Sequence, residues 1–194
     1  MMSPFPSVRP FEEEKVEEAL VRFGEAAVDA LLEFIVTWGG GFECRVGAHD
    51  SAFTALAKIG SQRATEPLLK MAEENRARRQ CCWALGGIAD QRAVEPLIKM
   101  LETAPDDISS DAVCSALGKI GDPRAVDPLI KMLTHTSVYI RLAAAEALGE
   151  LGDSRAVEPL KNILSDEAHS WFNSSEVSVG EVAAVALRQL DAEE

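Results

Sequence analysis

One phrase recurs four times along this chain of 194 residues, and the repetition constrains the fold more than any other feature. Its copies share a turn, an Arg-Ala pair and a Pro-Leu pair. They read AKIGSQRATEPLLKM from Ala57, GGIADQRAVEPLIKML from Gly86, GKIGDPRAVDPLIKML from Gly118 and GELGDSRAVEPLKNIL from Gly149. The prolines follow one another at intervals of 29 to 32 residues. A period of this length is typical of proteins built from stacked supersecondary units.

Each repeat predicts two helices. In the third copy, apolar residues spaced i, i+1, i+4, i+5 and i+8 form one helical face, namely Ala125, Val126, Leu129, Ile130 and Leu133. The repeated proline lies near the start of this first helix, where its missing amide proton is not needed. The turn before the helix holds a residue that can cap free amides, in successive copies Ser61, Asp90, Asp122 and Asp153.

Such helix pairs bury too little surface to be stable alone, so the repeats are expected to stack as an all-α solenoid. A leucine marks the same place in every second helix, at Leu56, Leu85, Leu117 and Leu148. Glycine follows this marker leucine at Gly86, Gly118 and Gly149, and would let neighbouring helices approach closely. We predict a loose N-terminus over 1–10 and one repeat domain over 11–194, divided into a degenerate cap repeat over 11–60, clear repeats over 61–164 and a C-terminal cap over 165–194.

The charge balance argues against two classes of partner. The chain has 32 acidic and 19 basic side chains, a formal net charge of −13, which repels phosphate backbones and anionic lipid. No apolar run approaches the roughly 20 residues that cross a bilayer. We therefore expect a cytoplasmic protein that binds neither nucleic acid nor membrane.

The chain shows no pattern typical of a catalytic or metal site. Four cysteines lack the C-x-x-C spacing and zinc spacing with histidine, so we expect reduced core residues at Cys44, Cys81, Cys82 and Cys114. There is also no recognisable Ser-His-Asp arrangement and no cysteine beside a histidine. Neither a cofactor nor a metal is expected, and a binding protein is favoured over an enzyme.

The segment from Gly121 to Leu133, GDPRAVDPLIKML, followed by RLAAAEALGEL from Arg141, resembles the short HEAT-like repeats of the phycobilisome-lyase type. The resemblance implies a right-handed α-α superhelix of the armadillo type, with about five helical hairpins and an N-terminal helix. Proteins with these repeats include bilin lyases, adaptors and assembly factors. The resemblance therefore leaves function open, and it supplies no metal ligands.

One row of side chains on the second helices varies between copies. It comprises the residues nine, six and two positions before the marker leucine and two after it, which lie on one helical face pointing away from the core. We call it the second-helix stripe. Its positions are Arg76, Arg79, Trp83 and Gly87, then Ile108, Asp111, Ser115 and Lys119, then Tyr139, Leu142, Glu146 and Glu150.

In solenoids similar to this one, the second helices line the concave surface, so this stripe is the candidate partner-binding site. We assign that role to Arg76, Arg79, Trp83, Asp111, Ser115, Lys119, Tyr139, Glu146 and Glu150. Trp83 stands out because Thr54, Ser115 and Glu146 hold the same place in other copies. Alternatively, Trp83 packs on a neighbouring helix.

Two basic features have a structural and a functional interpretation. The repeated arginines Arg63, Arg92, Arg124 and Arg155 lie near helix starts, where a cation is disfavoured. They are expected to pair with aspartates of their own or adjacent turns, the alternative being phosphate binding. The run Arg76, Arg78 and Arg79 either forms a solvated turn or meets an acidic partner or a bilin propionate.

Two insertions interrupt the period, over 37–51 and 165–180. Trp171 and Phe172 in the second insertion are expected to cover the end of the core, and the helix after it is expected over 176–190. The function favoured by these observations is a noncatalytic scaffold that binds another protein on its concave surface. The alternative is a bilin lyase or chromophore chaperone acting on a phycobiliprotein.

Overall fold

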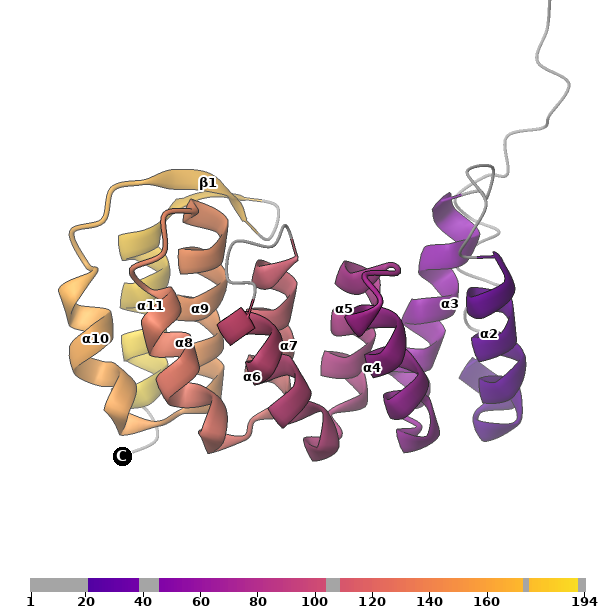
Figure 1. Cartoon of the computed structure of the whole chain (residues 1–194). Coiled ribbons are helices and arrows are strands. Elements are labelled where there is room, and N and C mark those ends of the chain that lie inside the picture. Colours follow the sequence, from indigo (N-terminus) through magenta and orange to yellow (C-terminus); the bar gives the residue numbers. More distant parts are fainter. Residues whose placement is uncertain (1–20, 39–45, 104–108, 173–174, 192–194) are drawn as a thin grey trace, which may run out of the picture.

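The computed structural model describes residues 21–38, 46–103, 109–172 and 175–191, and helices dominate this part of the chain. They stack as consecutive hairpins along one axis (Figure 1). The hairpins pair α2 (Glu25–Trp38) with α3 (Val46–Ile59), α4 (Thr65–Glu73) with α5 (Arg78–Ile88), α6 (Val94–Thr103) with α7 (Ser110–Ile120), α8 (Val126–Met132) with α9 (Val138–Leu151), and α10 (Val157–Asn162) with α11 (Val179–Asp191). This arrangement confirms the predicted solenoid of helical hairpins.

The first helices of the later hairpins all begin in the same way. A short 3-10 helix precedes each one, at Gln62–Ala64, Gln91–Ala93, Pro123–Ala125 and Ser154–Ala156. The predicted capping residue stands before it, and its side chain accepts a hydrogen bond from the backbone amide two residues on, as Asp122 does from Arg124 at 2.9 Å. The repeated proline is the third residue of each following α-helix, within its first turn. Both predictions for the helix start are confirmed.

The core runs along the interior of the stack, and the marker leucines Leu56, Leu85, Leu117 and Leu148 are fully buried in it. Successive second helices pack against each other through the glycine that follows the leucine. A Cβ atom on Gly118 would lie 2.7 Å from the Cα atom of Ala147, and one on Gly149 would lie 2.9 Å from the Cα atom of Ala186. The glycines therefore set the spacing between repeats, as the sequence predicts.

The second insertion contains structure that the helical prediction missed. Strands β1 (His169–Phe172) and β2 (Ser175–Ser178) form an antiparallel hairpin in which His169 is opposite Ser178. The hairpin lies across one end of α9 and α11 (Figure 1). The expected helix over 176–190 instead begins at Val179, because Ser178 and Glu181 cap it reciprocally, each accepting a hydrogen bond from the other's backbone amide.

Several predictions fall on residues outside the described ranges. They include the loose N-terminus over 1–10, Cys44 and Ile108, and residues 39–45 of the first insertion. The side chains of Trp171 and Phe172 are also outside the description, so their capping role stays a prediction. The division of 11–194 into two caps and a central set of repeats likewise stays a prediction. None of the described helices combines the length and apolarity needed to cross a membrane.

Candidate functional site

The repeated arginines are held by the turns between repeats. Each of the last three donates to the aspartate two residues before it, with nitrogen–oxygen distances of 2.6 to 2.8 Å at the closest atoms. Each also reaches the preceding repeat: Arg92 donates to the carbonyl oxygen of Gln62, Arg124 to Glu95 and Arg155 to Asp127. We call this row, from Arg63 to Arg155 with its capping residues, the turn edge. The predicted arginine–aspartate ladder is confirmed, and it connects neighbouring repeats.

Asp90 is the most buried carboxylate of the turn edge. It accepts hydrogen bonds from the Arg92 guanidinium, from the Arg92 amide and from the Thr65 hydroxyl, the last at 2.7 Å. The hydrogen bonds from Arg92, opposed by burial, lower the pKa of Asp90 to about 2. The pKa values of Asp122 and Asp153 are lowered for the same reason, by hydrogen bonds from Arg124 and Arg155. The turn edge is therefore a structural element with its charges already matched.

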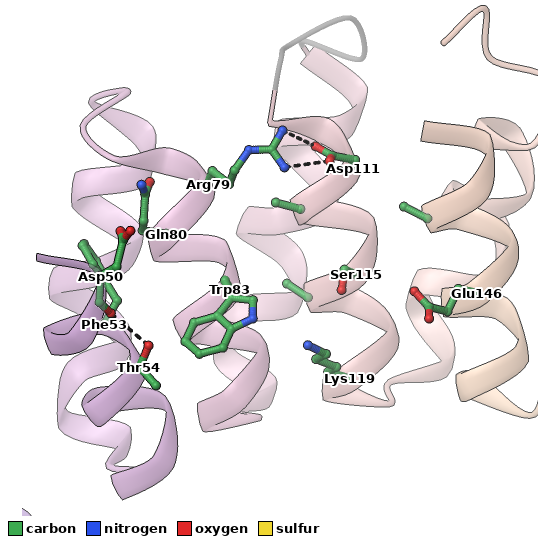
Figure 2. Close-up of a pocket in the computed structure, with 13 residues that line it drawn as sticks. Asp50, Phe53, Thr54, Arg79, Gln80, Trp83, Asp111, Ser115, Lys119 and Glu146 are labelled. Atoms are coloured by element: carbon green, nitrogen blue, oxygen red, sulfur yellow. Dashed lines mark hydrogen bonds and ion pairs between the residues drawn. The ribbon is translucent and has the colours of Figure 1, made fainter. Parts of the chain in front are cut away.

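A groove of about 450 Å³ opens where the second helices α3, α5, α7 and α9 lie side by side (Figure 2). Six of the nine predicted binding residues line it: Arg79, Trp83, Asp111, Ser115, Lys119 and Glu146. The second-helix stripe thus brings residues from three successive repeats to one surface. We refer to this hollow as the groove.

An ion pair bridges α5 and α7 at one end of the groove. The Arg79 guanidinium donates two hydrogen bonds to the Asp111 carboxylate, at 2.7 and 2.9 Å (Figure 2). The two residues occupy the same stripe position in neighbouring repeats. Their bidentate geometry fixes the guanidinium plane and neutralises both charges.

Trp83 lies in the middle of the groove, and 43% of its surface is exposed. The Lys119 ammonium from the next repeat lies 6.0 Å from the centre of the indole ring, a cation–π distance. Trp83 thus meets a side chain of the neighbouring helix α7 and keeps a large part of its surface exposed, and its partner-binding role stays a prediction. The indole remains available to a ligand.

Two carboxylates stand one turn apart on α9, at Glu146 and Glu150. Burial, followed by the charge of Glu146, raises the pKa of Glu150, while the positive charge of Lys119 opposes the shift. Glu150 is not among the lining residues of the groove but continues the stripe from Glu146. This end of the stripe therefore has more negative than positive charge.

The other predicted residues lie away from the groove lining. Arg76 donates to the carbonyl oxygen of Val36 near the end of α2 and pairs with Glu74, while Arg78 donates to the carbonyl oxygen of Ala72. Tyr139 is exposed at the start of α9, outside the groove. Leu142 was assigned to the outward stripe, and this is wrong: its side chain is fully buried in α9, the helix against which β1 packs.

Some groove residues were missed by the sequence analysis. Asp50 and Thr54 on α3 occupy the stripe positions of Arg79 and Trp83 in the preceding repeat, so extending the same count to the degenerate first repeat would have found Asp50. The floor is made of small residues, Ala112, Ala116 and Ala143. Their role could not be read from the sequence because alanine is equally common in helix–helix contacts.

The cysteines of the described chain are core residues. Cys81, Cys82 and Cys114 are free and fully buried, which confirms the prediction for these three. Burial raises the pKa of the Cys81 and Cys114 thiols to about 12, so neither is a reactive thiolate at neutral pH. Within the described ranges, no three or more His, Cys, Asp or Glu side chains gather as a metal site would require.

Comparisons with known proteins agree with this architecture. The family model for HEAT repeats matches residues 50–113 and 110–179. The structure is similar to the complex of CpcE and CpcF of phycocyanin lyase from Nostoc sp. PCC7120, with a TM-score of 0.54 and 19% identity, over 98% of this chain and 97% of that chain. It is also similar to an engineered protein, with a TM-score of 0.53 and 22% identity, over 93% of this chain and 92% of that one. No curated protein matches the sequence significantly.

Proposed function

Because the chain belongs to the HEAT-repeat family, we propose that it is a noncatalytic scaffold that holds a protein partner in the groove between α3 and α9. The single observation that carries this proposal is the exposed indole of Trp83 in the middle of the groove. The corresponding places in neighbouring repeats hold Thr54, Ser115 and Glu146, which a solvated face would favour.

The environment of Trp83 has the features of a binding hot spot. Such hot spots are enriched in tryptophan, tyrosine and arginine, and they lie near the centre of an interface. Trp83 has Arg79 one turn before it on α5, and Ser115 and Lys119 opposite on α7. A partner side chain placed on the indole would remove its exposed surface from water, which supplies binding free energy.

The groove's chemistry favours binding over catalysis. Of its charged groups, Arg79 and Asp111 are tied to each other in an ion pair, and the Lys119 ammonium lies over the Trp83 ring. Covalent catalysis needs a nucleophile activated by a neighbouring base, and the buried thiols of Cys81 and Cys114 have pKa values of about 12, too high for this role. The cytoplasmic location expected from the sequence remains a prediction.

The test is capture of partners from extract of the native cell, followed by mass spectrometry. The full chain is compared with Trp83→Ser, which installs the side chain found at the matching position 115, and with Phe23→Ser as control. Phe23 is also an exposed aromatic residue, at 69%, but is outside the groove. We expect Trp83→Ser to lose partners that the other two proteins retain. Equal capture by all three proteins would show that the groove is not the binding surface.

A second candidate function follows from the similarity to CpcE and CpcF: a bilin lyase or chromophore chaperone acting on a phycobiliprotein. The groove volume of about 450 Å³ lies in the range of small-molecule sites. The arginine run is poorly placed to hold a propionate, because Arg76 and Arg78 donate to main-chain carbonyl oxygens and Arg79 pairs with Asp111. For this reason the scaffold is the first proposal.

This candidate is tested by mixing the purified protein with phycocyanobilin. Binding would change the visible absorbance of the pigment, and Trp83→Ser would reduce the change if the groove is the site. A spectrum equal to the sum of the two components would eliminate the candidate.

A further inference from the structure

We infer that the groove receives a basic segment of the protein partner, with a lysine or arginine set against Glu146 and Glu150 and an apolar side chain on Trp83. This inference rests on the proposed function and specifies the chemistry of the partner. It is carried by the charges along the stripe, by the indole and by the size of the groove.

The end of the groove between α5 and α7 has its charges matched within the protein. The guanidinium of Arg79 and the carboxylate of Asp111 form two hydrogen bonds with each other. A partner anion at Arg79 would have to displace Asp111, and a partner cation at Asp111 would have to displace Arg79. This end of the groove therefore discriminates only weakly between positively and negatively charged side chains of a partner.

The end on α9 has an excess of negative charge. Glu146 and Glu150 are four residues apart on one helix, so their carboxylates lie on the same face and repel each other. Lys119 supplies a positive charge near Glu150, and its ammonium also lies 6.0 Å from the centre of the Trp83 ring. Burial and the charge of Glu146 both raise the pKa of Glu150, while the charge of Lys119 opposes the shift.

The apolar part of the groove suits one or a few partner side chains. Trp83 rises from α5 above a floor of Ala112, Ala116 and Ala143, whose short side chains leave the space above them empty. About 450 Å³ is near the lower end of the range of ligand pockets, so a short segment fits where a folded domain would not. The combination of a cation site beside an aromatic platform matches a segment with alternating basic and apolar residues.

The complementarity extends to the whole molecule. A formal net charge of −13 attracts a basic segment at long range and raises its association rate at low salt. An acidic segment would be repelled both by the molecule as a whole and by the α9 end of the groove. The charge of the molecule and of the groove therefore favours a basic partner segment over an acidic one.

The experiment uses selection from an unbiased library of twelve-residue peptides displayed on phage, with the immobilised full chain as target. A peptide from the enriched set is then synthesised with a fluorescein label, and its affinity is measured by fluorescence anisotropy. The variants are Trp83→Ser, the double variant Glu146→Gln with Glu150→Gln, and a control with Glu73→Gln and Glu102→Gln. The control removes the same charge from exposed positions on the first helices α4 and α6.

We expect enriched peptides to contain lysine or arginine next to apolar residues. The groove double variant should weaken their binding about tenfold or more and the control by less than about twofold, because a contact charge pair is local and long-range attraction is screened by salt. Single substitution Glu146→Gln should give an intermediate loss. Thermal unfolding followed by circular dichroism verifies that each variant is folded.

The other outcomes separate this inference from the proposed function. Peptides that lose binding with Trp83→Ser but are neutral or acidic, or that bind the groove double variant unchanged, would overturn the basic segment and leave the groove as the binding surface. Peptides indifferent to Trp83→Ser, or a selection that enriches none, would count against both.

Discussion

The turn edge and the groove come from the same repeats, but the turn edge keeps its side chains from copy to copy whereas the groove changes them. At the turn edge, arginine recurs at 63, 92, 124 and 155, in each case reaching the preceding repeat. In the groove, one position holds threonine, tryptophan, serine and glutamate in turn.

The difference reflects what each surface must satisfy. A turn-edge arginine contacts the previous repeat, so changing it alters the way two repeats stack. The variable stripe residues of the groove, such as Trp83 and Ser115, remain partly exposed beside core residues such as Ala116 and Ala143. The repeat period therefore identifies structural residues, and departures from it on an outward face identify candidate binding residues.

We expect the greatest loss of stability when the spacing between neighbouring repeats is altered. Gly118→Val would place side-chain atoms within 3 Å of Ala147, since a Cβ atom alone would already lie 2.7 Å from its Cα atom. We expect roughly 3 kcal/mol loss in the free energy of unfolding, measured with urea, because overpacking forces the backbones apart. Ser115→Val on the groove face of the same helix is the control, with a change below about 1 kcal/mol. Similar losses for both variants would contradict the glycine's role in spacing.

The next prediction compares the loss of stability on removing one carboxylate from the turn edge with the loss on removing one from the groove. Asp90→Ala removes a helix cap and leaves the buried Thr65 hydroxyl without its acceptor, so we expect a loss of about 2 kcal/mol in the free energy of unfolding. Asp111→Ala breaks an ion pair in which Arg79 is half exposed, and should cost less than about 1 kcal/mol. Urea unfolding of the two variants measures both. If Asp111→Ala were the more destabilising, the turn edge would not be the structural region.

Acid should destabilise the protein through the aspartates of the turn edge. The pKa of Asp90 is about 2 in the folded state, against 3.8 ordinarily, so the unfolded chain binds its proton at higher pH than the folded chain does. The resulting stability, about 2 kcal/mol, is complete above roughly pH 5 and is lost as the pH falls from about 4 to 2. Asp122 and Asp153 act in the same direction. Thermal unfolding across this range should show a shallower decline for Asp90→Asn, and equal slopes would contradict the assignment.

A smaller effect is expected at the turn where alanine takes the place of the glycine that precedes the capping residue. Ala89 has φ of 56°, whereas the matching places in the other repeats hold Gly60, Gly121 and Gly152, with φ of 68° to 76°. Ala89→Gly should stabilise the protein by about 1 kcal/mol because it relieves the left-handed conformation of a residue with a Cβ atom. Gly121→Ala is the reverse control and should destabilise it by a similar amount. Both are measured by urea unfolding.

The regular part of this protein could be predicted from the amino-acid sequence. Hairpin order, the buried marker leucines, the caps before each first helix and the arginine–aspartate ladder all follow from a period that repeats local geometry in register. When each unit contacts its neighbours in the same way, a position in one copy predicts the same position in the next. Six groove residues were accessible by this route, through a helical count from the marker leucine.

Where the period ends or neighbouring repeats differ, the positions of the side chains depend on tertiary contacts. Leu142 occupies the stripe position of Arg79 and Asp111 but is buried, in the helix against which β1 packs. The Arg76 side chain turns to the carbonyl oxygen of Val36, and Lys119 approaches Trp83 from the next repeat. These outcomes depend on which surfaces meet at a distance in the chain, and a repeat pattern contains no information on the segments that interrupt it.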